Sequence, residues 1–302
     1  MKQPSREEIE AGLAPLDKRL HLINMKNGAC WNRHLHGISP SELAEKLLKL
    51  DGNPVITIRA DPKVTTHHMP ELAMEIKSPG HYHLHIIIHP GELHLEHLEV
   101  APGKHGQGTA KKLLAWVVDL AAHVPVLASE DKTVRLTTIA GLRNGAYSWA
   151  RFGFTPYVDT NPELDSWAQL KKTIQRARLN QDASRIVYDV DEVESCDFNV
   201  ESPYMKNYSK GFQLTADEQA VIKAALASDD PKALWVISDL GRVLAQPSPS
   251  AQPVTVGKAI LCGLSWGGEL RLDPREAGYQ RLAAYLAPLI AQSQQKGNGR
   301  GI

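Results

Sequence analysis

The stretch that most constrains the fold of this chain covers residues 93–114 and reads LHLEHLEVAPGKHGQGTAKKLL. Its first half alternates leucine with polar residues as far as Val100, which predicts a half-buried β-strand. Ala101-Pro102-Gly103 interrupts that pattern. Apolar residues then recur at helical spacing from Leu113 to Leu120, which predicts an amphipathic helix. The sequence therefore predicts a strand that passes through a glycine-bearing turn directly into a helix.

The turn before this helix is a candidate anion-binding site. The first-turn amides of a helix have no intrahelical acceptor, and the macrodipole is positive there. Gly106 and Gly108 would let a phosphate approach the backbone closely. A P-loop would need a lysine where Thr109 stands. A dinucleotide GxGxxG fingerprint is present only in its first half, at Gly106-Gln107-Gly108.

A third reading of the turn is a coenzyme A loop. The segment Val100-x-Pro102-x-x-His105-Gly106-Gln107-Gly108-x-Ala110 resembles the loop of the GNAT superfamily of acyl-CoA N-acyltransferases. That family has the pattern Arg/Gln-x-x-Gly-x-Gly/Ala. Gly108 and Ala110 match it, whereas His105 replaces the arginine or glutamine.

A second point of resemblance follows about forty residues later. GNAT proteins carry an Asn-led short helix that ends in Tyr-x-x-x-Gly-Phe before a final strand. Here Asn144 leads the predicted helix and Gly153-Phe154 ends it, while Trp149 stands where the tyrosine is usual. The resemblance covers about residues 80–158.

The resemblance implies an α/β (α+β) fold, with a GNAT-like mixed, mostly antiparallel sheet flanked by helices. Residues 1–158 would form the acyl-CoA-binding domain together with N-terminal helices. Residues 159–302 would form a mainly helical extension or second domain, and we expect the polar tail after Gln292 to be disordered. The implied activity is an acetyl-CoA-dependent N-acetyltransferase that acts on an amine-bearing small molecule or protein.

The implied cofactor site consists of the end of the strand, the turn and the start of the two helices. Backbone N–H groups near the strand end would meet the thioester oxygen, and Lys104, Lys111 and Lys112 would add positive charge for the phosphates. The residues expected to bind coenzyme A are Leu98, Glu99, Val100, His105, Gly106, Gln107, Gly108, Thr109, Ala110 and Asn144.

Acyl transfer also needs a group that takes a proton from the acceptor ammonium. In the family this group lies four or six residues before the valine matched by Val100, which are the positions of Glu96 and His94. Both lie on one face of a strand of period two. Glu96 is the first choice because a carboxylate also attracts the ammonium. Tyr147 is the candidate acid for the leaving thiolate, two residues from the family's usual position.

Two other classes of function stay open. One is a non-catalytic GNAT-like module that binds an acyl-CoA or a protein. The other is a thiol hydrolase, because Asn27-Gly28-Ala29-Cys30-Trp31 is similar to the surroundings of papain-type nucleophiles. Such an enzyme needs a histidine about 130 residues downstream. All thirteen histidines lie between His21 and His123, so we expect Cys30 and Trp31 to be packing residues.

The alternating residues His81, His83 and His85 allow two readings. Histidines at i and i+2 share a strand face and can hold zinc. The favoured reading is a solvated strand face, and no metal site is assigned to the chain.

Composition narrows the partners of the protein. With 302 residues the chain is large enough for one large or two modest domains. Lys plus Arg and Asp plus Glu are equal at 34 each, which argues against bulk binding of nucleic acid or membrane. Three widely spaced cysteines indicate a reducing, cytoplasmic compartment. Residues 1–12 have no apolar core, so we expect no classical secretion signal. Export as an effector or toxin-like acetyltransferase stays open.

Overall fold

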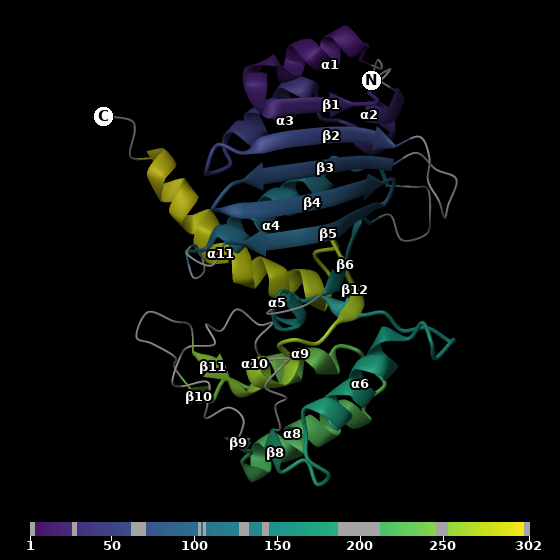
Figure 1. Cartoon of the computed structure of the whole chain (residues 1–302), viewed down its shortest axis with the longest axis vertical. Helices are drawn as coiled ribbons and strands as arrows, with labels where there is room; N and C mark the ends of the chain where they lie inside the picture. The colour runs from purple at the N-terminus through teal and green to yellow at the C-terminus, as the bar shows by residue number, and fades with distance from the viewer. Residues whose placement is uncertain are drawn as a thin grey trace. The chain divides into compact units, whose positions relative to one another are not determined.

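The computed structural model describes residues 4–25, 29–61, 71–101, 104, 107–126, 133–140, 145–186, 212–245 and 253–298 (Figure 1). Its contacts divide the chain into two compact units. The first comprises Met1–Thr137, Arg271–Asp273 and Leu286–Ile302, and the second comprises Thr138–Leu270 and Pro274–Tyr285. The division differs from the expected boundary at residue 158, because it falls inside a strand and assigns late segments of the chain to the first unit.

The first unit is organised around a mostly antiparallel sheet, as the sequence predicts. Its strands lie in the order β1 (Leu20–Ile23), β2 (Val55–Asp61), β3 (Glu71–Ser78), β4 (Tyr82–His89) and β5 (Glu92–Val100), followed by β6 (Arg135–Ala140). β1 pairs with β2 in parallel, and β2 through β5 pair antiparallel. β4 and β5 form an antiparallel hairpin, with Gly91 at a positive φ of 80° in its turn.

The helices in the N-terminal part of the first unit differ in how they begin. They are α1 (Arg6–Leu13), a 3₁₀ segment η1 (Ala14–Arg19), α2 (Ala29–His34), α3 (Pro40–Leu48) and α4 (Thr109–Ala121). Before α1 and α3, Ser5 and Ser39 each form a capping box with the glutamate three residues later. An ion pair between Lys46 and Asp119 joins α3 to α4.

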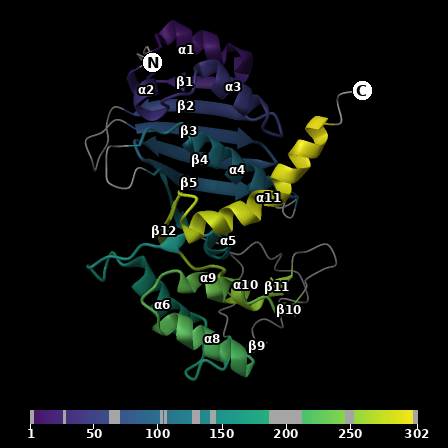
Figure 2. The ribbon, with the colours of Figure 1, turned by 180° about the vertical axis from the view of Figure 1, so that it is seen from behind.

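Helix α4 covers one face of this sheet, and no described helix covers the other. Viewed from the front, α4 lies behind the sheet, and after a turn of 180° it lies in front (Figures 1 and 2). The covered face carries the buried residues Ile58, Ile76, Ile86 and Leu95, and α4 contributes buried apolar residues such as Leu114. This burial of aliphatic side chains is the main source of the unit's stability.

The opposite face, which we call the polar face, carries charged and imidazole side chains. β4 alternates strictly between buried residues and half-exposed ones, and its half-exposed positions are His83, His85, Ile87 and His89. In the ladder His83 stands opposite Lys77, and His85 stands opposite Glu75. A strand that buries only one of its faces can present this composition to water on the other.

The second unit is mainly helical in its described part. Its elements are α5 (Gly145–Arg151), β7 (Thr155–Pro156), α6 (Ser166–Ala177), β8 (Arg185–Ile186), β9 (Phe212–Gln213), α8 (Ala216–Ala227), α9 (Ala233–Ser238), β10 (Val243–Ala245), β11 (Val254–Thr255), α10 (Val256–Leu261), most of β12 (Trp266–Arg271) and the first part of α11 (Ala277–Asn298). Within it, β7 pairs antiparallel with β12.

The Gly153-Phe154 pair has a structural role in this unit. Gly153 follows α5 with a φ of 97°, and a Cβ there would collide with the carbonyl oxygen of Gly278. Phe154 is buried against the ring of Trp149, with ring centroids 4.9 Å apart. A left-handed glycine at a helix end and a buried aromatic residue therefore account for this pair without reference to any ligand.

Asn161 lies in a turn, where its side-chain oxygen accepts a hydrogen bond from the Glu163 amide, and α6 begins at Ser166 with Asp165 as its cap. One local expectation is corrected. The tail is not disordered directly after Gln292, because α11 continues to Asn298. Alanine, glutamine and lysine favour a helix there. No helix in the described part of the chain has the length and apolar character needed to cross a membrane.

Candidate functional site

The centre of the candidate site is a β-bulge in β5. In the β4–β5 ladder Ile86 stands opposite Leu95 and His85 stands opposite His97, so Glu96 is the extra residue. The bulge has a sequence signal that a plain alternating pattern overlooks. Apolar residues occupy odd-numbered positions up to Leu95 and even-numbered positions from Leu98. One extra residue between them keeps both leucines on the covered face.

The bulge brings the two proposed proton acceptors into contact. His94 Nε2 lies 3.2 Å from Glu96 Oε2. The side chain of His94 is 20% exposed and that of Glu96 is 49% exposed. His94 stands opposite Ile87 in the ladder and so belongs to the polar face. The imidazole of His94 is therefore mostly buried, and its Nε2 lies beside the half-exposed carboxylate of Glu96.

Three further residues form a series of hydrogen bonds behind His94, and Thr137 is the one that contacts it. Its Nδ1 lies 2.9 Å from the hydroxyl oxygen of Thr137, which donates to Glu92 Oε1 at 2.9 Å. Glu92 Oε2 accepts from Arg135 Nη2 at 3.2 Å. Thr137 and Arg135 lie on β6, more than forty residues along the chain. Sequence reasoning missed these groups, because nothing in a single strand pattern shows which side chain a neighbouring strand supplies.

The remaining histidines of the polar face form contacts across β3, β4 and β5. His83 Nε2 lies 3.0 Å from Glu75 Oε1, and the rings of His83 and His97 have centroids 4.6 Å apart. Burial is the main cause that lowers the pKa of His83 and of His85. Within the described residues no three His, Cys, Asp or Glu side chains are arranged to hold a metal ion. In this part of the chain the face is a half-exposed polar surface.

The turn at the start of α4 has the conformation that the glycine pattern predicts. Gly108 is the N-cap residue with φ 78°, and a Cβ there would meet no atom within 4 Å. No side chain caps this helix and no acidic residue lies in its first turn, unlike α1 and α3. The first helical hydrogen bond runs from the Lys112 amide to the Gly108 carbonyl at 3.0 Å. Thr109 and Ala110 thus begin the helix at its positive end.

The other residues expected to bind coenzyme A are placed as follows. Leu98, Glu99 and Val100 stand opposite Leu84, His83 and Tyr82 in the ladder. Gln107 is exposed, and its amide lies 3.4 Å from the carbonyl of Lys104. Lys112 Nζ lies 2.6 Å from Asp51 Oδ2 in an exposed ion pair. His105, Gly106 and Asn144 lie outside the described residues.

Tyr147 lies in α5 of the second unit. Its hydroxyl oxygen accepts a hydrogen bond from Arg151 Nη1 at 3.1 Å, and the guanidinium lies over the ring at 5.8 Å. This arrangement leaves the phenol hydrogen available as a donor. Its role as an acid stays a prediction.

The alternative nucleophile, Cys30, has a histidine neighbour that the papain spacing does not consider. Its Sγ lies 3.6 Å from His34 Nδ1 on the next turn of α2. The same nitrogen lies 2.8 Å from the Cys30 carbonyl oxygen, and the His34 side chain is fully buried. Burial raises the pKa of the Cys30 thiol. A reactive cysteine needs the opposite shift, so this geometry disfavours a thiol nucleophile. Trp31 is a buried packing residue, as predicted.

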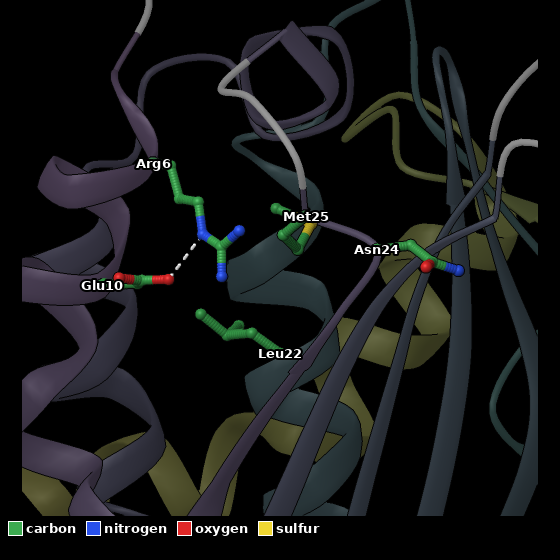
Figure 3. A pocket seen from close by; sticks show the side chains of 5 residues that line it. All are labelled: Arg6, Glu10, Leu22, Asn24 and Met25. Atoms are coloured by element: carbon green, nitrogen blue, oxygen red, sulfur yellow. Dashed lines mark hydrogen bonds and ion pairs between the residues drawn. The ribbon is translucent and has the colours of Figure 1, made fainter.

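A pocket of about 220 Å³ lies between α1 and β1, away from the candidate site (Figure 3). Arg6 and Glu10 of α1 line one side of it, with Arg6 Nε 2.7 Å from Glu10 Oε1, and Leu22, Asn24 and Met25 line the other side. Its charged groups are already paired with each other. β1 also stands at the opposite end of the strand order from β5 and β6. We assign no chemistry to this pocket.

Comparison of the chain with protein-family models, with curated proteins and with solved structures gave no match in any of the three searches.

Proposed function

We propose that this protein is an acetyl-CoA-dependent N-acetyltransferase that acts on an amine acceptor. The observation that carries the proposal is the contact of 3.2 Å between His94 and Glu96 at the bulge of β5. That strand leads through the Gly108 turn into the uncapped start of α4. A proton-accepting pair and a candidate phosphate-binding turn therefore lie on one continuous β–turn–α unit.

The cofactor half of the proposal rests on the start of α4. The amides of Thr109 and Ala110 lie in the first helical turn, where the dipole favours an anion. Lys104, Lys111 and Lys112 add positive charge in sequence around this turn. Gly108 leaves open space on its Cβ side, which is what close approach of a pyrophosphate to the backbone needs.

The acceptor half of the proposal rests on the His94–Glu96 pair. An alkylammonium with a pKa near 10 must lose a proton before it can attack a thioester carbonyl. A carboxylate attracts the ammonium, and an imidazole or carboxylate accepts the proton directly or through one water. Such a group typically contributes ~10²–10⁴-fold in rate.

A pair of substitutions at Gly108 tests the cofactor site. Aspartate and asparagine both tolerate a positive φ better than other residues, so Gly108→Asp and Gly108→Asn differ mainly in charge. We expect the aspartate variant to bind acetyl-CoA at least about tenfold more weakly than the asparagine variant, a difference of about 1.4 kcal/mol. Calorimetry with acetyl-CoA measures this difference, and circular dichroism checks that both variants are folded.

Two outcomes of this experiment would count against the proposal. One is wild-type protein that binds neither acetyl-CoA nor coenzyme A. The other is equal affinity of the two folded variants, which would remove the turn from the cofactor site. Mass spectrometry of coenzyme A species that co-purify with the wild-type chain gives an independent check of the cofactor.

A non-catalytic acyl-CoA-binding module is the competing function, and replacement of Glu96 separates it from the enzyme. Glu45 on α3 provides a control, because it is an exposed glutamate outside β5 and outside the turn before α4. Glu96→Gln should lower the rate of acetyl transfer without weakening acetyl-CoA binding, whereas Glu45→Gln should preserve both. A module without catalysis would show binding but no transfer in the wild-type protein.

A further inference from the structure

Four side chains form a continuous series of polar contacts that ends at the candidate site. It runs from Glu92 through Thr137 and His94 to Glu96, with successive distances of 2.9, 2.9 and 3.2 Å. Thr137 is almost fully buried, at 2% exposed. The series passes from this hydroxyl through the 20% exposed imidazole of His94 to the 49% exposed carboxylate of Glu96. Its open end therefore lies at the Glu96 side.

The number of available hydrogens fixes the direction of the inner bonds. A carboxylate only accepts hydrogen bonds, and Glu92 accepts one from Arg135 and one from Thr137. The Thr137 hydroxyl has a single hydrogen, which it donates to Glu92. The Thr137 oxygen can therefore only accept from His94 Nδ1, so this nitrogen carries a hydrogen.

This arrangement determines what the outer nitrogen of His94 can do. With a hydrogen on Nδ1, the neutral ring has its lone pair on Nε2, which faces Glu96 Oε2 at 3.2 Å. Two acceptors at that distance can both accept from one donor group placed beside them. An ammonium group has several N–H donors and a positive charge, and so fits both atoms.

We propose that Glu92 and Thr137 are positioning residues that fix the tautomer of His94, so that His94 Nε2 is the atom that takes the proton from the acceptor amine. Glu96 then attracts the ammonium and stabilises the imidazolium that forms. The catalytic consequence rests on the proposed acetyltransferase function. The tautomer of His94 does not, and it can be measured in the protein alone.

The proton-transfer step is balanced within the pair and its substrate. An N–H bond of the alkylammonium breaks, its electron pair stays on the amine nitrogen, and a new N–H bond forms at His94 Nε2. The positive charge moves from the substrate to the imidazole ring, where the carboxylate of Glu96 lies within 3.2 Å. The freed amine can then attack the thioester carbonyl.

Nuclear magnetic resonance of the full chain with ¹⁵N-labelled histidine tests the tautomer directly. The chemical shifts of the two ring nitrogens distinguish a hydrogen on Nδ1 from one on Nε2, and a His94→Gln variant identifies the signals of His94. At a pH where the ring is neutral, we expect the wild-type protein to carry the hydrogen on Nδ1. Neutral His94 with its hydrogen on Nε2 would overturn the proposal.

Two matched variants extend the test. Thr137→Val keeps the shape of the buried side chain but removes the hydroxyl, whereas Thr137→Ser retains the hydroxyl. The valine variant should lose the preference for Nδ1–H, and the serine variant should keep it. Glu92→Gln is the second test variant if the valine variant fails to fold, because the Glu92 side chain is 28% exposed. Its amide can donate as well as accept, so it should also relax the tautomer. An unchanged tautomer in both folded variants, Thr137→Val and Glu92→Gln, would overturn the proposal.

Kinetics with acetyl-CoA and a lysine-containing peptide test the catalytic consequence. Thr137→Val should lower kcat about tenfold or more with little change in KM for acetyl-CoA, and Thr137→Ser should restore it. If the wild-type chain is active and Thr137→Val has the same kcat, the positioning role would be overturned. A wild-type chain with the expected tautomer but no transfer would overturn the proposed function and the catalytic role, while the series of polar contacts would stand.

Discussion

At the residue scale, the imidazoles of the polar face differ in what surrounds them. His94 is held on one side by Thr137 and meets Glu96 on the other. His85 and His83 lie across the ladder, where burial lowers their pKa. Histidines on one sheet face therefore have different surroundings: His94 lies between a hydroxyl and a carboxylate, whereas burial favours the neutral form of His83 and His85.

The lowered pKa values predict how stability depends on pH. Unfolding returns His83 and His85 to the ordinary histidine pKa of about 6.5. Below that value the unfolded chain binds protons more readily than the folded chain, so the free energy of unfolding falls as pH drops through about 6.5 toward the lowered pKa. Replacement of His85 by glutamine should reduce this loss.

Urea denaturation of the wild type and of His85→Gln between pH 5 and pH 8 checks this expectation. Between pH 7 and pH 8 both rings are neutral in either state, so the two stability curves should run parallel. They should converge or cross as the pH falls below about 6.5. Parallel curves over the whole range would contradict the role assigned to His85.

At the element scale, the bulge decides which side chains of β5 meet the core. It lets Leu95 and Leu98 share the covered face although three positions separate them. It also places Glu96 outside the regular ladder, beside His94. A bulge of this kind redirects a strand locally without ending it.

Deletion of Glu96 should therefore be more damaging than its substitution. Without the extra residue, either Leu98 and Val100 turn toward the polar face or the turn before α4 must shift. Lost burial of these partly buried side chains should lower the free energy of unfolding by about 1–3 kcal/mol. Glu96→Ala keeps the residue count and is the control, expected within about 0.5 kcal/mol of wild type. Similar stability of the two variants in urea denaturation would argue against this role of the bulge.

At the scale of the whole molecule, segments from the end of the chain belong to the unit built around β1–β5. Arg271–Asp273 and the residues from Leu286 onward count with this unit. The amide of Leu272 donates to the carbonyl of Val134 at 2.9 Å, and Leu286 is buried. The two units are therefore not consecutive pieces of the sequence.

Truncation after residue 158 should consequently destabilise the first unit. The fragment loses the Leu272 hydrogen bond and the burial of Leu286, which together contribute about 2 kcal/mol or more. Hydrogen exchange of β3 and β4 amides should be faster in fragment 1–158 than in the full chain. A peptide of residues 266–302, added in trans, should slow it again. Equal exchange in the fragment and the full chain would show that the late segments contribute little.

The sequence by itself determined the elements whose signals are local. The strand to Val100 and the helix that follows the Gly108 turn were predicted and are present, and the capping boxes at Ser5, Ser39 and Thr215 likewise have their signal within four residues of sequence. Each depends on hydrogen bonds or side-chain periodicity within a few residues, which a linear pattern contains. The sequence also places His94 and Glu96 two positions apart on one strand, whereas their contact depends on the bulge.

The tertiary structure alone decided what lies behind His94 and which segments complete the first unit. Thr137 reaches Nδ1 from a strand 43 residues away, and Leu272 meets Val134 from much farther along the chain. Such contacts depend on which strands become neighbours and in which register. Strand pairing is set by the packing of the whole sheet rather than by the local sequence of either strand.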